Sequence, residues 1–185
     1  MLPKYSIAIH PSQELIIKIK AMKEQLAEEV DWFNSKNSIA HITICEFKSN
    51  ESDLERVKKQ LVRICNTIMP ITVHLNDFGS FPNGAFFIAP DKNSKMALLP
   101  IMKSFHNALI VKTVHHSDEP HLSIARKLSS ENLIKASKLF TTIDETFLCD
   151  GIVLRKFDEE LRQFRVIDNF EFKGLEPLEV QGSLF

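Results

Sequence analysis

Two short segments of this chain repeat one pattern of residue types. Residues 40–45 (AHITIC) and 120–125 (PHLSIA) each place a histidine, an apolar residue, a hydroxyl residue and a second apolar residue in succession. Side chains alternate between the two faces of a strand, so His41 and Thr43 share one face, as do His121 and Ser123, while the intervening apolar residues point into a core. Each segment therefore predicts a half-buried strand that carries a proton-transfer group beside a hydroxyl.

The two segments lie in similar surroundings. The two histidines, at positions 41 and 121, are 80 residues apart, a separation natural for a duplicated lobe. Hydrophobic periodicity and turn residues predict the following elements: strand 5–9, a helix opening at Ser12, strand 39–47, a helix with a capping box at Ser52 and Glu55, strands 71–78 and 85–89, helix 98–110, the second histidine strand, helix 130–140, and strands 146–156 and 164–172. The third helix is placed after residue 97 because Pro100 disfavours a helix interior.

This order predicts an α+β fold made of two lobes related by a pseudo-twofold axis, each with an antiparallel sheet and helices. The chain of 185 residues is long enough for one such bilobal domain over residues 1–185, but hardly for two independent domains. Packing of the lobes would bring the two histidine strands face to face across a groove. We expect that groove to be an active-site cleft.

Composition limits the partners and the compartment. The formal net charge of −1 gives little attraction to a long nucleic-acid duplex. The three cysteines are odd in number and widely spaced, which is typical of a reducing compartment. Neither a leader-like N-terminus nor an apolar run of membrane-spanning length occurs. We therefore expect a cytoplasmic monomer that makes no contact with a membrane.

Two histidines suit phosphodiester chemistry. An imidazole both gives and takes a proton near neutral pH, and displacement at phosphorus needs a base for the attacking oxygen and an acid for the departing one. The hydroxyls of Thr43 and Ser123 could donate to the non-bridging phosphate oxygens. Carboxylates do not cluster near the motifs, so we expect neither a metal nor another cofactor.

Metal binding and base stacking are alternative roles for residues near the motifs. A zinc site of His41, Cys45 and His121 is disfavoured, because residues four apart on a strand lie roughly 13 Å apart. The aromatic side chains of Tyr5 and Phe81 could stack a base, and packing in the core is the alternative for each.

The paired histidine segments resemble the double H-x-[ST] signature of the two-histidine (2H) phosphoesterase superfamily, in particular its bacterial 2'-5' RNA ligase and cyclic phosphodiesterase-like branch. Outside the motifs, the resemblance extends to residues 78–82 with 85–88, which follow the segment that the family places between its motifs. Residues 151–154 with 164–167 are similar to its closing hairpin. The resemblance covers the chain from about Tyr5 to Phe172.

The resemblance implies a bilobal fold that acts on 2',3'-cyclic phosphates. One motif histidine would activate water, or a ribose hydroxyl in the ligation direction, and the other would protonate the leaving oxygen. By position, Thr43 and Ser123 would hold the phosphate. Arg126 lies five residues after His121, where ligase-like members carry a phosphate-binding arginine. On a regular strand this odd offset places Arg126 on the opposite face, so the role requires a bulge or a strand end.

The leading hypothesis is a metal-independent phosphoesterase that opens 2',3'-cyclic phosphates of RNA ends or nucleotides, with reverse joining to 2'-5' linkages. In this hypothesis His41 and His121 are the catalytic residues, and Thr43, Ser123, Arg126, Tyr5 and Phe81 bind the substrate. The alternative is a nucleotide or RNA-end binding protein without turnover. A third hypothesis keeps the enzyme but gives it another cyclic phosphodiester, such as ADP-ribose cyclic phosphate.

Overall fold

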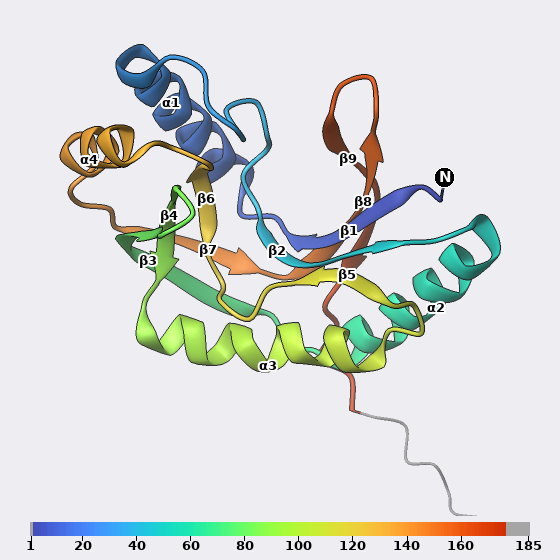
Figure 1. Ribbon diagram of the computed structural model, residues 1–185. Coiled ribbons are helices and arrows are strands. Elements are labelled where there is room, and N and C mark those ends of the chain that lie inside the picture. The colour runs from blue at the N-terminus through green and yellow to red at the C-terminus, as the bar shows by residue number, and fades with distance from the viewer. Residues whose placement is uncertain (1, 177–185) are drawn as a thin grey trace, which may run out of the picture.

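The computed structural model describes residues 2–176, which form an α+β fold around one strongly curled antiparallel sheet (Figure 1). The strands are β1 (Lys4–Ile9), β2 (Ile42–Lys48), β3 (Ile71–Phe81), β4 (Ala85–Pro90), β5 (Thr113–His116), β6 (Leu122–Ala125), β7 (Glu145–Cys149), β8 (Gly151–Asp158) and β9 (Gln163–Glu171). The helices among the described residues are α1 (Gln13–Val30), α2 (Glu51–Thr67), α3 (Lys92–Ala108) and α4 (Ser130–Leu139). None of these helices is long and apolar enough to cross a membrane.

Each helix begins at a polar N-cap, whose side chain accepts a hydrogen bond from a backbone N–H in the first turn. The four caps are Ser12, Asn50, Asp91 and Ser129. The expected capping box at Ser52 is therefore wrong, because Asn50 caps α2 instead.

The expected start of α3 near Leu98 is also wrong, since the helix begins at Lys92 and continues through Pro100. Asp91 caps the helix with a bond of 2.7 Å from the backbone N–H of Ser94, while Leu98 and Phe105 anchor one side of it in the core. Pro100 lies on the exposed side, where the lost hydrogen bond is tolerated.

The strands form one continuous sheet in the order β7-β3-β4-β6-β2-β1-β8-β9, with β5 paired to β2. The expectation of a separate sheet in each lobe is therefore corrected: β2 and β6, the two histidine strands, are neighbours at the middle of one sheet. They lie side by side instead of facing each other across a groove. The strand expected over 146–156 is broken at Asp150 into β7 and β8, which lie in different halves of the sheet, and β5 was not expected.

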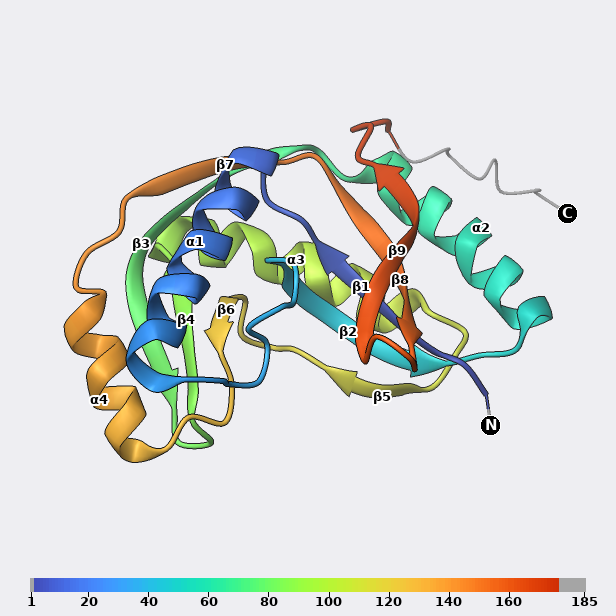
Figure 2. The same cartoon turned by 90° about the horizontal axis from the view of Figure 1, so that it is seen from above.

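The pairing pattern is equivalent in the two halves of the sheet. On one side of the centre, β2 is followed by β1, β8 and β9, and on the other side β6 is followed by β4, β3 and β7. Helices cover the outside of both halves (Figures 1 and 2). Helix α2 contacts β9 in one half, and α1 and α4 contact β6 and β4 in the other, while α3 spans both halves through contacts to β2, β3 and β4.

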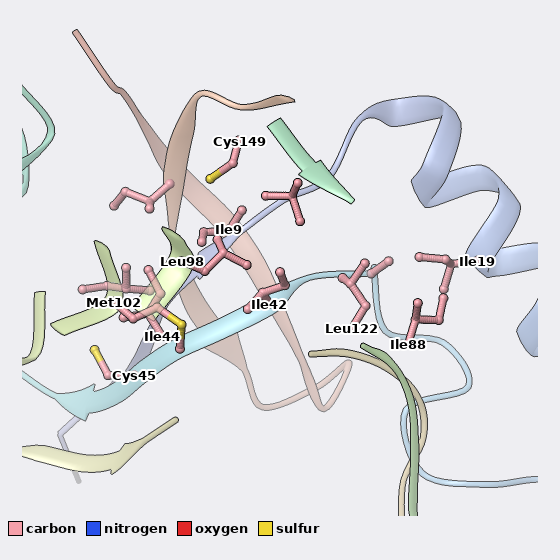
Figure 3. Close-up of a cluster of buried hydrophobic side chains, with 14 of the residues drawn as sticks. Ile9, Ile19, Ile42, Ile44, Cys45, Ile88, Leu98, Met102, Leu122 and Cys149 are labelled. Carbon is pink, nitrogen blue, oxygen red and sulfur yellow. The ribbon is translucent and has the colours of Figure 1, made fainter. Parts of the chain in front are cut away.

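The core is continuous beneath the two central strands. Ile42 and Leu122 are fully buried there, with Leu98 of α3 packed toward β2 and Ile19 of α1 packed toward β6 (Figure 3). Burial of each such side chain stabilises the fold by about 1.5–3 kcal/mol. This packing fixes which face of β2 and β6 is directed away from the helices.

Candidate functional site

Ile42 of β2 pairs directly with Leu122 of β6 in an antiparallel ladder. Continuing that register by one residue in each direction places His41 opposite Ser123 and Thr43 opposite His121. The four polar side chains therefore form a square on one face, with the two histidines on a diagonal. Diagonal neighbours of this kind lie about 7–8 Å apart.

Burial follows the same alternation in both motifs. The side chains at positions 41, 43, 121 and 123 are partly exposed, whereas Ile42, Ile44, Leu122 and Ile124 are fully buried. We call the side of β2 and β6 that bears His41, Thr43, His121 and Ser123 the histidine face. The structure thus brings the predicted catalytic residues and both motif hydroxyls together on one accessible surface.

The two imidazoles are held in the same way. Nδ1 of His41 donates to the carbonyl oxygen of Ile39 at 2.6 Å, and Nδ1 of His121 donates to the carbonyl oxygen of Glu119 at 2.8 Å. A carbonyl oxygen only accepts, so Nδ1 carries the proton in the neutral ring and Nε2 is the basic nitrogen. Each ring is therefore oriented by the backbone two residues before it, and Nε2 remains for chemistry.

Both imidazoles have a lowered pKa. Burial lowers the pKa of His41 well below its ordinary value, and the nearby guanidinium of Arg155 lowers it further. Burial also lowers the pKa of His121, while its bond to the Glu119 carbonyl and the Glu119 carboxylate oppose that shift. The physical cause is that burial penalises the charged ring. Burial therefore favours the neutral form of each ring, which is the form that acts as a base.

Each histidine strand contains a bulge at the same point of its motif. The ladder between β2 and β1 skips Ile44, and the ladder between β6 and β4 skips Ile124. Each bulge shifts the alternation of side chains by one residue. Arg126 is thereby turned to the same side as His121, and Glu46 is turned to the same side as His41. The bulge at Ile124 is the departure from a regular strand that the odd offset of Arg126 requires. The backbone of Arg126 is held by a bridge to Asn34.

Aromatic side chains surround His121. The ring of Phe81 lies 5.3 Å from the imidazole centroid in an edge-on arrangement, and the ring of Phe87 lies 4.9 Å from it. Phe87 pairs with Gly79 across the β3–β4 ladder, where a Cβ on the glycine would lie 2.5 Å from the Phe87 ring. Phe81 was predicted near the site and is placed beside His121, whereas Phe87 was missed because the run of residues 85–89 is apolar throughout.

Polar side chains surround His41 instead. The ring of His10 lies 6.5 Å from that of His41, and burial lowers the pKa of His10 to about 4. Arg155 of β8 is buried, and its Nη2 donates to the hydroxyl of Ser6 at 2.7 Å. Sequence reasoning missed both residues. Arg155 is followed by Lys156, and a pattern of two adjacent cations does not reveal which one faces inward.

The predicted role of Tyr5 and the disfavoured zinc site at Cys45 both lack a basis in the structure. Tyr5 is only 2% exposed and stacks on Phe47 at 5.6 Å in the core, so it is not brought to the histidine face. Cys45 is fully buried, because the bulge at Ile44 turns it away from His41. Within residues 2–176 no group of three or more potential metal-ligating side chains is placed to hold a metal ion.

A curled antiparallel sheet with two equivalent histidine strands at its centre defines the class of fold, and comparison with known families agrees with it. Residues 11–161 match the family described as the 2'-5' RNA ligase superfamily. The chain therefore belongs to the 2'-5' RNA ligase superfamily, as the paired motifs predicted.

Similar proteins occur among curated bacterial sequences. A Bacillus cytotoxicus protein, provisionally named as a phosphoesterase, is 32% identical over 92 residues, which cover 48% of this chain and 52% of that protein. A Staphylococcus saprophyticus protein with the same kind of name is 26% identical over 135 residues, covering 70% of this chain and 79% of that protein. The chain spans about half the length of the Bacillus relatives that it matches.

Solved structures share the fold at low sequence identity. The protein TT0787 of Thermus thermophilus has a TM-score of 0.67 and 13% identity, with 92% of this chain and 98% of that chain covered. Escherichia coli LigT complexed with 3'-AMP has a TM-score of 0.66 and 10% identity, with 93% and 99% covered. At such identities the likeness concerns the fold.

Proposed function

We propose that this protein is a metal-independent phosphoesterase that opens 2',3'-cyclic phosphates of RNA ends or nucleotides. The observation that carries the proposal is the diagonal placement of His41 and His121 on one face, each with Nδ1 bonded to a backbone carbonyl. For proton transfer, Nε2 of each histidine must come within about 2.6–3.2 Å of a phosphate oxygen. A phosphate group fits between the two rings at this spacing. The substrate would lie over the histidine face of the curled sheet.

The reaction needs one proton taken and one proton given. Nε2 of one imidazole accepts the proton of the attacking water as the water oxygen bonds to phosphorus. The other imidazole, protonated also on Nε2 when the anionic phosphate is bound, gives that proton to the ribose oxygen as the bond between this oxygen and phosphorus breaks. Each transfer contributes about 10²–10⁴-fold to the rate. With a ribose hydroxyl of a second RNA end in place of water, the same pair opens the ring by attack of that hydroxyl on phosphorus. The 3' oxygen leaves and takes the proton, and the ends are joined through a 2'-5' linkage.

The neighbouring donors hold the charge that develops on the phosphate. The hydroxyls of Thr43 and Ser123 lie within the square formed with the histidines, so they can donate to the non-bridging oxygens. Arg126, turned to the same side by the bulge, would add a charge-assisted contact to the phosphate. Phe81, beside His121, would take a base by stacking. A structural neighbour, E. coli LigT, has been crystallised with 3'-AMP, which supports a nucleotide ligand.

The proposal is tested by incubating the purified protein with a nucleoside 2',3'-cyclic phosphate in the presence of a chelator. We expect ring opening by the native chain, and a loss of at least about 10²-fold in each of His41→Asn and His121→Asn. His74→Asn is the matched control, since His74 lies on β3 and pairs with Asp91 and Asp144. Binding of the nucleotide without any product would support a non-catalytic RNA-end binding protein instead.

A further inference from the structure

The two sides of the histidine face are equivalent in position but differ in chemistry. Across the ladders, Ser6 of β1 pairs with Arg155 of β8, just as Ala85 of β4 pairs with Phe81 of β3. Because the two halves of the sheet have the same pairing pattern, Arg155 occupies on the His41 side the position that Phe81 occupies on the His121 side. One flank is therefore aromatic and the other is cationic.

Arg155 lacks the partner that a buried guanidinium normally has. It is only 3% exposed, and no carboxylate among residues 2–176 lies within ion-pair distance of it. Its Nη2 donates to Ser6, its guanidinium carbon lies 5.1 Å from the ring centroid of Phe164, and its Nε has no hydrogen-bond partner in the described structure. The nearby carboxylate of Glu46 pairs with Lys4 at 2.5 Å.

A second buried polar atom lies on the same flank. Nε2 of His10, whose ring lies beside that of His41, also has no hydrogen-bond partner among the described residues. An unpaired buried cation and an unsatisfied ring nitrogen are both costly, and a ligand that accepts their hydrogen bonds removes that cost. A guanidinium prefers a phosphate or a carboxylate as its acceptor.

We propose that Arg155 and His10 form an anion-binding subsite on the His41 side, which takes a second phosphate of the substrate, the one attached to the 5' carbon of the terminal ribose. The proposal rests on the proposed function, because it assumes that the reacting phosphate lies between His41 and His121. The base of the same nucleotide then packs against Phe81 and Phe87 on the other flank. The substrate class is a nucleotide with a 5'-phosphate or phosphodiester, as at an RNA end, in preference to a nucleoside cyclic phosphate.

The test compares ligands that differ by one phosphate. Binding of a nucleoside 3'-phosphate, a nucleoside 3',5'-bisphosphate and a 3'-phosphorylated dinucleotide is measured by titration calorimetry. For the native chain we expect both larger ligands to bind at least about tenfold more tightly than the nucleoside 3'-phosphate. One charge-assisted contact provides a gain in affinity of this size. A gain with the dinucleotide identifies an RNA chain as the source of the second phosphate, and a gain with the bisphosphate alone identifies a free nucleotide.

Arg155→Met removes the subsite cation, and Lys156→Met is the matched control. Lys156 pairs with Tyr5, whose side chain is in the core. Directly paired residues share a face of the sheet, so Lys156 is directed to the face of β8 opposite that of Arg155. Its replacement removes the same charge as the replacement of Arg155. We expect Arg155→Met to abolish the preference for the bisphosphate and the dinucleotide, whereas Lys156→Met retains it. The thermal midpoint of Arg155→Met should not fall, since an apolar side chain replaces an unpaired buried charge.

Equal binding of all three ligands by the native chain would overturn the subsite. So would an equal loss of affinity for all three in Arg155→Met, because Arg155 would then act on the reacting phosphate or on the fold. These binding results do not depend on turnover. Failure of the proposed function is seen separately, as a lack of ring opening by a native chain that still binds the ligands.

Discussion

Ile42 of β2 and Leu122 of β6 are paired directly opposite each other at the centre of the sheet. Both side chains are fully buried, and this single register brings the residues before and after each of them together on the opposite face. A slip of one residue would direct the histidines into the core. The position of the candidate site is thus determined by the same apolar packing that stabilises the fold.

The motif hydroxyls should contribute through hydrogen bonding. Thr43→Val and Ser123→Ala each remove a donor from the square beside the histidines, and we expect kcat to fall by about 10²–10³-fold for opening of a nucleoside 2',3'-cyclic phosphate. Thr43→Ser and Ser123→Thr keep the donor and should retain most of the activity. Loss of activity in the conservative pair, to the same extent, would show that shape at these positions matters more than the hydroxyl.

The bulge at Ile124 turns Arg126 to the side of His121, where we propose that it contacts the phosphate. Arg126→Met should raise KM for the cyclic phosphate by about tenfold or more, because one charge-assisted hydrogen bond is lost. Lys127→Met removes the same charge from the next position, which has a positive φ and is exposed, and it should leave KM nearly unchanged. Equal effects of the two variants would mean that only the general positive charge is sensed.

The carboxylate of Glu119 should affect the pH profile through His121. This carboxylate raises the pKa of His121 against the dominant effect of burial, so Glu119→Gln lowers that pKa further. The limb of the kcat/KM profile that belongs to His121 should move to lower pH, while the backbone carbonyl that orients the ring is retained. Asp118→Asn is the control, since Asp118 pairs with His116 at 3.4 Å. A profile unchanged by Glu119→Gln would contradict the assignment.

His10 should make the fold sensitive to acid. Burial and the charge of Arg155 lower the pKa of His10 to about 4, below its unfolded value of 6.5. The unfolded chain therefore binds a proton before the folded chain does, so stability present above pH 6.5 is lost as the pH falls toward 4. His10→Gln should reduce that loss by about 1–3 kcal/mol, measured by denaturant titration between about pH 7 and pH 4. His115→Gln, at an exposed position of β5, should leave the loss unchanged.

The two motifs and most of the strands and helices could be predicted from the sequence because their signals are local, whereas β5 and the start of α3 were missed. The cap at Ser12 and the alternation around His41 and His121 depend only on neighbouring residues. The hairpin strands β3 and β4 were predicted for the same reason. The break at Asp150 was missed, although Asp150-Gly151 is a local turn signal, because apolar residues flank it on both sides (147–149 and 152–154).

The remaining features of the site depend on long-range pairing. No local pattern shows that a ladder skips Ile44 and Ile124, and those two bulges decide where Arg126 and Cys45 point. The face of β8 on which Arg155 lies is likewise set by its pairing with Ser6, a residue far away in the sequence. The sequence thus predicts the paired histidine motifs, while the residues that flank them in space emerge only from the fold.

The central claim is that His41 and His121 flank one phosphate group. The most direct test is an NMR titration of the protein with ¹⁵N-labelled imidazoles by a nucleoside 3'-phosphate, with the two rings assigned from His41→Asn and His121→Asn. We predict that Nε2 of both rings shifts along one saturation curve with a single dissociation constant, while Nδ1 of each ring stays bonded to its carbonyl. A response from only one of the two rings, or two curves with different midpoints, would contradict the account.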